Sequence, residues 1–260
     1  MRAAAVGRGI ATFCLLVAAA AGGCAWISSA DKPEALVRDG RDLYLARRYD
    51  EAIAKLERAT DLDGSNWTAH LYLARCYMAK ENWTLAIAEA RLAHEGQPDD
   101  EEVEQALSAA LLGGGSAAVH TKEFTLAIAD FNEYIGLHPN DARGFLGLGE
   151  ADVAAGHYAN ALVAYTRGIE IDRLGAVKED LLRGLLEGGT RALQRGEAKD
   201  AVPLLKEYVR INPTNAAAYL ALARALLETG NETTAREALD HALLLDPRQP
   251  DAAALRSRLR

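Results

Sequence analysis

A unit of 34 residues repeats along this chain and is clearest between Asn215 and Pro247. Within it, apolar and small residues recur at steps of three and four, first from Tyr219 to Leu226 and again from Ala235 to Ala242. That spacing places each set on one face of a helix. A Gly-Asn pair separates the two sets and a proline ends the unit, so we predict a helical hairpin. A single hairpin cannot bury both of its faces, so the copies must pack on one another.

The alanine that opens the second helix of the unit marks every copy. It is found at Ala52, Ala86, Ala127, Ala161, Ala201 and Ala235. The successive spacings are 34, 41, 34, 40 and 34 residues, so six hairpins fall into three pairs. Repetition at this period predicts an all-α solenoid, in which each repeat contacts only its neighbours and there is no globular centre.

The two longer spacings predict lengthened first helices near 101–121 and 177–195. Six or seven extra residues are close to two helical turns, so the apolar face keeps its direction. Each long helix contains a double glycine, Gly114-Gly115 or Gly188-Gly189, although a glycine there costs roughly 1 kcal/mol relative to alanine. Either a neighbouring helix packs too closely there for a side chain, or the helix forms a hinge or a flat spot where a ligand approaches the backbone.

The repeats resemble the tetratricopeptide repeat family over roughly residues 32–247. Among the residues that carry the resemblance are Gly40, Tyr49 and Ala52 in the first copy and Gly149 and Tyr158 in the fourth. The resemblance implies a right-handed superhelix of antiparallel helix pairs. It also implies that a protein or peptide binds in a concave groove lined by the first helix of each pair. The segment 248–260 that follows the last repeat is predicted to form a capping helix.

The family's groove positions, carried over to this chain, predict a set of partner-binding residues. They are Arg41, Tyr44, Tyr72, Arg75, Met78, Ser116, Arg143, Glu150, Arg183, Thr190 and Arg224. Tyr, Met and Arg are enriched at protein interfaces. Basic groups in an otherwise acidic chain favour a partner with acidic or terminal carboxylate groups. The alternative is that these side chains are ordinary solvated or packed residues.

The N-terminal segment has the pattern of an export signal. Arg2 and Arg8 precede a short apolar run over residues 10–21, followed by small residues and Cys24. The stretch 21–24 resembles a bacterial lipobox, which implies a signal peptide over 1–23, acylation of Cys24 by chains such as palmitate, and a short tether over 24–31. Because no Asp follows Cys24, the resemblance implies the periplasmic face of the outer membrane. Ordinary export and a retained anchor are the alternatives.

Charge and motifs argue against nucleic acid binding and catalysis. The formal charge is −8, and without residues 1–23 the chain carries 27 basic and 37 acidic side chains, whereas phosphate binding needs clustered Lys and Arg. The six histidines are scattered, and HExxH, CxxC and GxSxG are absent from the sequence. We therefore expect no catalytic residues, no metal and no cofactor, and we expect Cys76 to be a core residue.

Together these features predict a non-catalytic protein–protein interaction scaffold. It would be an outer-membrane lipoprotein that assists assembly of an envelope complex, and it resembles the pilotin lipoproteins of type IV pilus secretins. An adaptor for peptidoglycan enzymes is an equally ranked alternative, and a self-associating structural solenoid is another. An enzyme is the rival from a different class. The pattern selects no partner, pathway or oligomeric state.

Overall fold

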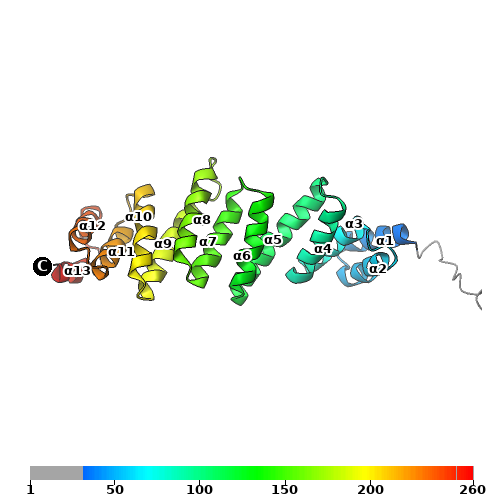
Figure 1. Ribbon diagram of the computed structural model, residues 1–260, viewed down its shortest axis with the longest axis horizontal. Helices are drawn as coiled ribbons and strands as arrows, with labels where there is room; N and C mark the ends of the chain where they lie inside the picture. Colours follow the sequence, from blue (N-terminus) through cyan, green and yellow to red (C-terminus); the bar gives the residue numbers. More distant parts are fainter. Residues whose placement is uncertain (1–31, 250, 260) are drawn as a thin grey trace, which may run out of the picture.

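The computed structural model describes residues 32–249 and 251–259, and these are all-α. Six hairpins stack side by side into an elongated row, as predicted (Figure 1). The first helices are α1 (Pro33–Leu45), α3 (Trp67–Ala79), α5 (Glu101–Thr121), α7 (Ala142–Ala155), α9 (Lys178–Gln194) and α11 (Ala216–Glu228). The second helices are α2 (Tyr49–Leu62), α4 (Trp83–Gly96), α6 (Phe124–Leu137), α8 (Tyr158–Ile171), α10 (Ala198–Ile211) and α12 (Glu232–Leu245). A short helix, α13 (Ala252–Arg258), follows.

Short polar side chains begin several of the first helices. The Asp100 carboxylate accepts hydrogen bonds from the backbone N–H groups of Glu102 and Val103 at 2.9 and 3.1 Å. The Asn215 side chain accepts from the N–H of Ala218 at 3.1 Å. Each bond satisfies an N–H that the helix cannot satisfy itself, so these residues set where the helices start.

The core consists of successive clusters along the row, the largest of which runs from α7 to α13. The six marker alanines are all 0% exposed. Each sits where the second helix of a hairpin approaches its neighbours, and a larger side chain would overpack that contact. The regular spacing of these alanines therefore reflects the close packing of the helices.

The row is concave on the side of the first helices. Each first helix contacts the next one, from α1 through to α11. Among the described second helices, only α8 and α10 come comparably close. Because first helices lie nearer to one another than second helices do, their side forms the inner, concave face and the second helices form the outer face.

The two long helices are present, with one correction. Helix α5 spans the predicted residues 101–121, but α9 is one residue shorter than predicted at each end. The remaining extra residues form a longer α8–α9 loop, in which the Asp172 carboxylate accepts from the N–H groups of Ala176 and Val177, both at 2.9 Å. The insertion in the fifth repeat is therefore shared between helix and loop.

The double glycines are explained by close packing, and neither long helix is broken there. A Cβ atom on Gly115 would lie 2.8 Å from the Phe131 ring, and one on Gly189 would lie 2.6 Å from Leu205. Helices α5 and α9 continue unbroken through both pairs. Apolar side chains of neighbouring helices fill these places, so the glycines make room for them.

The last helix covers the end of the row, as expected. Helix α13 packs against α12, and Leu255 and Leu259 are 3% and 4% exposed. Arg236 donates from Nη2 to the Leu259 carbonyl at 2.5 Å. The predicted signal peptide, Cys24 and the tether lie outside the described residues. Among residues 32–249 and 251–259, no helix combines the length and apolar character needed to cross a membrane.

Candidate binding groove

Three of the predicted groove residues meet at the N-terminal end of the concave face. The ring centroids of Tyr44 on α1 and Tyr72 on α3 lie 5.7 Å apart with the rings nearly edge to face. The Arg75 guanidinium lies 5.3 Å from the centroid of the Tyr72 ring and donates to Glu102 on α5 at 2.9 Å. We call Tyr44, Tyr72 and Arg75 the tyrosine–arginine cluster.

The tyrosine–arginine cluster forms a surface with a fixed shape. Its three side chains are half-buried, and contacts among rings and with a cation hold each in one orientation. Tyr49, the first residue of α2, extends the cluster with a ring centroid 5.9 Å from that of Tyr44. The sequence shows Tyr49 as a repeat marker, but its contact with the groove depends on how α1 and α2 pack.

The next predicted residues do not join this cluster. Met78 is half-buried and packs against the core formed by α3, α4 and α5. Ser116 is exposed on α5, and Arg41 is exposed on α1, where it pairs with Asp42 at 3.5 Å. Met78 therefore contributes to stability more than to an open binding surface.

A hollow of about 370 Å³ opens in the middle of the row, where the first three turns of α5 face the end of α6 and the start of α7. It is lined by Glu101, Glu104, Gln105, Ser108, Ala109, Leu112, Tyr134, His138 and Arg143. The spacing of the repeats predicts the longer α5. The spacing does not predict that this helix lines a hollow, because the hollow depends on the position of the α6–α7 loop.

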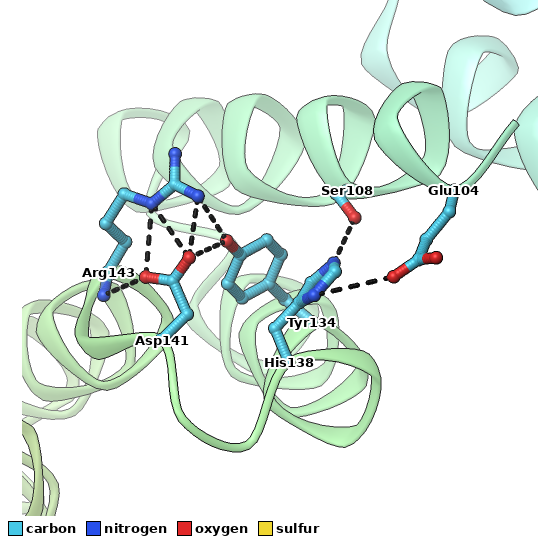
Figure 2. Close-up of polar contacts among 6 residues, drawn as sticks. All are labelled: Glu104, Ser108, Tyr134, His138, Asp141 and Arg143. Carbon is cyan, nitrogen blue, oxygen red and sulfur yellow. Dashed lines mark hydrogen bonds and ion pairs between the residues drawn. The ribbon is translucent and has the colours of Figure 1, made fainter. Parts of the chain in front are cut away.

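One wall of this hollow is a hydrogen-bonded group around Arg143 (Figure 2). Arg143 donates from Nη2 to Asp141 at 2.6 Å and to the Tyr134 hydroxyl at 3.0 Å, and that hydroxyl donates to Asp141 at 2.8 Å. The hydrogen bonds from Arg143 lower the pKa of Asp141 to about 2. Burial raises the pKa of Tyr134 to about 12. At neutral pH the group is therefore a fixed ion pair with a neutral phenol.

Beside this group, a serine, a histidine and a carboxylate lie in sequence, and the His138 ring centroid is 4.9 Å from that of Tyr134 (Figure 2). The Ser108 Oγ lies 2.5 Å from His138 Nε2, and His138 Nδ1 lies 3.6 Å from Glu104. The order resembles a hydrolytic triad, but Ser108 is in the interior of α5. There the neighbouring backbone N–H groups already donate to carbonyl groups of the helix. Acyl transfer needs such donors free to stabilise an oxyanion. These contacts therefore hold α5 against the C-terminal end of α6.

The remaining predicted residues lie along the C-terminal half of the groove. Desolvation by the surrounding helices raises the pKa of the surface residue Glu150, while Arg183 lowers it and nearby acidic groups add to the rise. The Thr190 hydroxyl donates to the Leu186 carbonyl of its own helix at 2.9 Å. Arg224 pairs with Asp251 at 2.6 Å beside hollows of about 430 and 290 Å³.

All five groove arginines form ion pairs with carboxylates of the same chain. The pairs are Arg41 with Asp42, Arg75 with Glu102, Arg143 with Asp141, Arg183 with Asp180 and Arg224 with Asp251. The sequence suggests basic spots that would attract an acidic partner, but the folded chain has already neutralised them. An acidic partner would therefore meet a carboxylate of the chain beside each arginine.

Metal and thiol chemistry gain no support from the structure. Among the described residues, no group of three His, Cys, Asp or Glu side chains is placed to hold a metal ion. Cys76 is 0% exposed, and burial raises the pKa of its thiol to about 11. A buried neutral thiol is a packing residue, as the sequence suggests.

Comparisons with known proteins agree with this architecture. Two profiles of the tetratricopeptide repeat match residues 38–101 and 192–259, together just over half of the chain. Superkiller protein 3 of Schizosaccharomyces pombe is 27% identical over 116 residues, which make up 45% of this chain but only 8% of that protein. The chain thus spans less than a tenth of this relative.

Solved structures resemble this chain at low sequence identity. The structure of Naa15/Naa10 bound to HypK-THB matches with a TM-score of 0.58 and 17% identity, over 89% of this chain and 34% of that one. The structure of pilF from Pseudomonas aeruginosa matches with a TM-score of 0.38 and 18% identity, over 86% and 96% of the two chains. The repeats, the fold and the two profile matches show that the chain belongs to the tetratricopeptide repeat family and is a protein–protein interaction scaffold.

Proposed function

We propose that this protein is a lipid-anchored scaffold on the periplasmic face of a bacterial outer membrane. There it binds another envelope protein in its concave groove and assists assembly of a complex such as the secretin of a type IV pilus. The tyrosine–arginine cluster is the observation that supports the binding role. The lipobox-like sequence ending at Cys24 supports the anchor.

The tyrosine–arginine cluster has the properties of a binding hot spot. Tyr and Arg are enriched among the few residues that dominate interface energies. Their mutual contacts hold these side chains in place before a partner arrives, so binding loses little side-chain entropy.

The cluster also lies in the hairpins nearest the proposed anchor. Helix α1 begins at Pro33, and Tyr44 and Tyr72 lie on the first helices of the first two hairpins. The residues between Cys24 and Pro33 can span at most roughly 25 to 30 Å when fully extended. A partner bound at the cluster would therefore be held close to the membrane surface.

Crosslinking of the full-length protein in its native membrane, followed by purification and identification of the bound proteins, tests the proposal. Tyr72→Ala and Arg75→Ala should each weaken recovery of the partner, since loss of a hot spot costs about 2 kcal/mol or roughly 30-fold in affinity. Arg210→Ala is the matched control because Arg210 is an exposed, ion-paired arginine on the second helix α10. Cys24→Ser should release the protein from the membrane.

The identity of the captured protein separates the candidate functions. A secretin subunit, lost with the cluster variants and kept with Arg210→Ala, supports the pilotin-like role. Cell-wall enzymes with the same dependence indicate an adaptor for peptidoglycan enzymes. Recovery of this chain alone would reject both roles in favour of self-association, and equal recovery with all variants would remove the cluster as the binding site.

A further inference from the structure

A hollow of about 470 Å³ lies on the outer face, away from the concave groove. Helices α6 and α8 form its sides, and α7 lies between them as its floor. Its apolar lining includes Ile128 on α6, Phe145 and Leu148 on α7, and Val163 on α8. Val163 is 67% exposed. An apolar concavity of this size is large enough to enclose a side chain of a partner.

The equivalent position one repeat earlier is spanned by an ion-pair bridge. Arg91 on α4 reaches across to α6, where its Nη2 lies 2.5 Å from Glu133 and 3.9 Å from Asp130. Arg91 stands five residues after its marker alanine, and the two carboxylates stand three and six residues after theirs. The bridge therefore connects neighbouring second helices at defined positions of the repeat.

Between α6 and α8 the same three positions cannot form that bridge. Counted from their marker alanines, they are occupied by Asn132, Ala164 and Arg167. Arg167 turns instead to Glu170 of its own helix, at 3.0 Å. Each bridging charge is thus absent or reversed, and the hollow is found where the bridge would otherwise lie.

The polar end of the hollow presents a hydrogen-bond acceptor. Asp152 is 3% exposed, and its carboxylate lies 3.3 Å from Nδ1 of His157. Because a carboxylate accepts a hydrogen bond, this contact favours the tautomer with the proton on Nδ1, in which Nε2 is an acceptor. The His157 side chain is 56% exposed, so this nitrogen is within reach of a ligand.

We propose that this outer hollow binds a tyrosine or tryptophan side chain of a partner polypeptide. The ring would lie against Phe145, Leu148 and Val163, and its O–H or N–H would donate to Nε2 of His157. Tyrosine and tryptophan combine a large apolar body with a single donor, which matches the apolar lining and the acceptor on His157 better than a purely apolar side chain does. The site is independent of the concave groove and of the partner proposed for it.

A titration of the isotopically labelled full-length protein with single-residue probes tests the site. The probes are N-acetyl-tyrosinamide, N-acetyl-tryptophanamide and N-acetyl-phenylalaninamide, followed by backbone amide chemical shifts. The first two should shift resonances of α6 to α8 and bind at least fivefold more tightly than the phenylalanine probe. Equal binding of all three probes would reject the role of His157.

Three variants and one control variant sharpen the test. Val163→Glu places a charge at the mouth of the hollow and should weaken binding at least tenfold, whereas Leu244→Glu, at an exposed position on α12, should not. His157→Phe should remove the preference for the tyrosine probe while the phenylalanine probe still binds. The combined change Asn132→Arg, Ala164→Asp and Arg167→Glu recreates the bridge and should close the site, provided that circular dichroism shows an intact fold.

Three other outcomes would overturn the proposal. Chemical shifts confined to α1 and α3 would place the aromatic site in the concave groove. Unchanged binding with Val163→Glu would exclude the outer hollow. Dimerisation of the chain that Val163→Glu abolishes, without binding of any probe, would identify this face as a contact between two copies.

Discussion

Asp130 makes the stability of the solenoid depend on pH in an unusual direction. Its side chain is 2% exposed on α6, and its Oδ2 has no hydrogen-bond partner among the described residues. The nearest cation, Arg91, lies 3.9 Å from Oδ1 and is closer to Glu133. Burial raises the pKa of Asp130 to about 6, Arg91 opposes the rise, and Glu133 adds to it.

The sign and size of the effect follow from this pKa. The folded protein binds the proton more tightly than the unfolded chain, whose Asp130 has the ordinary pKa of 3.8. The stabilisation from protonation is therefore complete below pH 3.8 and is lost as pH rises through 6. A difference of roughly two pKa units corresponds to about 3 kcal/mol, of which about 1.4 kcal/mol should separate pH 5 from pH 7.5.

Asp130→Asn removes the charge at every pH and should stabilise the protein at pH 7.5 by about 2 to 3 kcal/mol. The advantage should shrink by about 1.4 kcal/mol at pH 5. Urea unfolding monitored by far-UV circular dichroism at both pH values measures it, with Asp240→Asn on the exposed face of α12 as the control. A destabilised Asp130→Asn variant at pH 7.5 would refute the reasoning, because it would mean that the attraction of Arg91 outweighs the cost of burial.

Three further predictions concern packing, reactivity and the α8–α9 loop. Gly115→Ala should destabilise the protein by about 1 to 3 kcal/mol in urea unfolding, because the added methyl group would meet Phe131. Gly136 in α6 has open space around it, so Gly136→Ala should instead stabilise the protein by up to about 1 kcal/mol. Cys76 should not react with a thiol reagent at neutral pH until the protein unfolds, and fast labelling of the native state would contradict its burial. Asp172→Ala removes two hydrogen-bond acceptors for backbone N–H groups before α9 and should cost about 1 kcal/mol; unchanged stability and unchanged amide exchange there would show that the loop does not need them.

Local patterns in the sequence are sufficient to predict the fold. The period of the marker alanines records six hairpins, since each alanine occupies a contact that tolerates only a small side chain. The change from 34 to 41 residues locates the long helix α5 because added turns must keep the apolar face inward. The spacing did not predict how the second insertion is divided between α9 and the loop before it. Asp172 accepts hydrogen bonds from the N–H groups of Ala176 and Val177, and this keeps these two residues in the loop.

The candidate sites depend on contacts between repeats, and here the sequence is less informative. The register of the first helices indicates which residues face the groove, but it does not indicate that Tyr44, Tyr72 and Arg75 touch while Ser116 stands apart. Nor does it show that each groove arginine is paired with a carboxylate of the chain, since partners such as Arg75 and Glu102 lie on different helices.

The sequence by itself determined the architecture, the marker contacts and the absence of known catalytic motifs, because these follow from periods of three, four and 34 residues. Tertiary structure alone decided where surface is open and which charges are free. Those properties depend on the distance between neighbouring repeats, as the bridge formed by Arg91 and the hollow beside Ala164 show. Both occupy equivalent places in the repeat, and one is closed and the other open because of side chains that meet only when the hairpins stack.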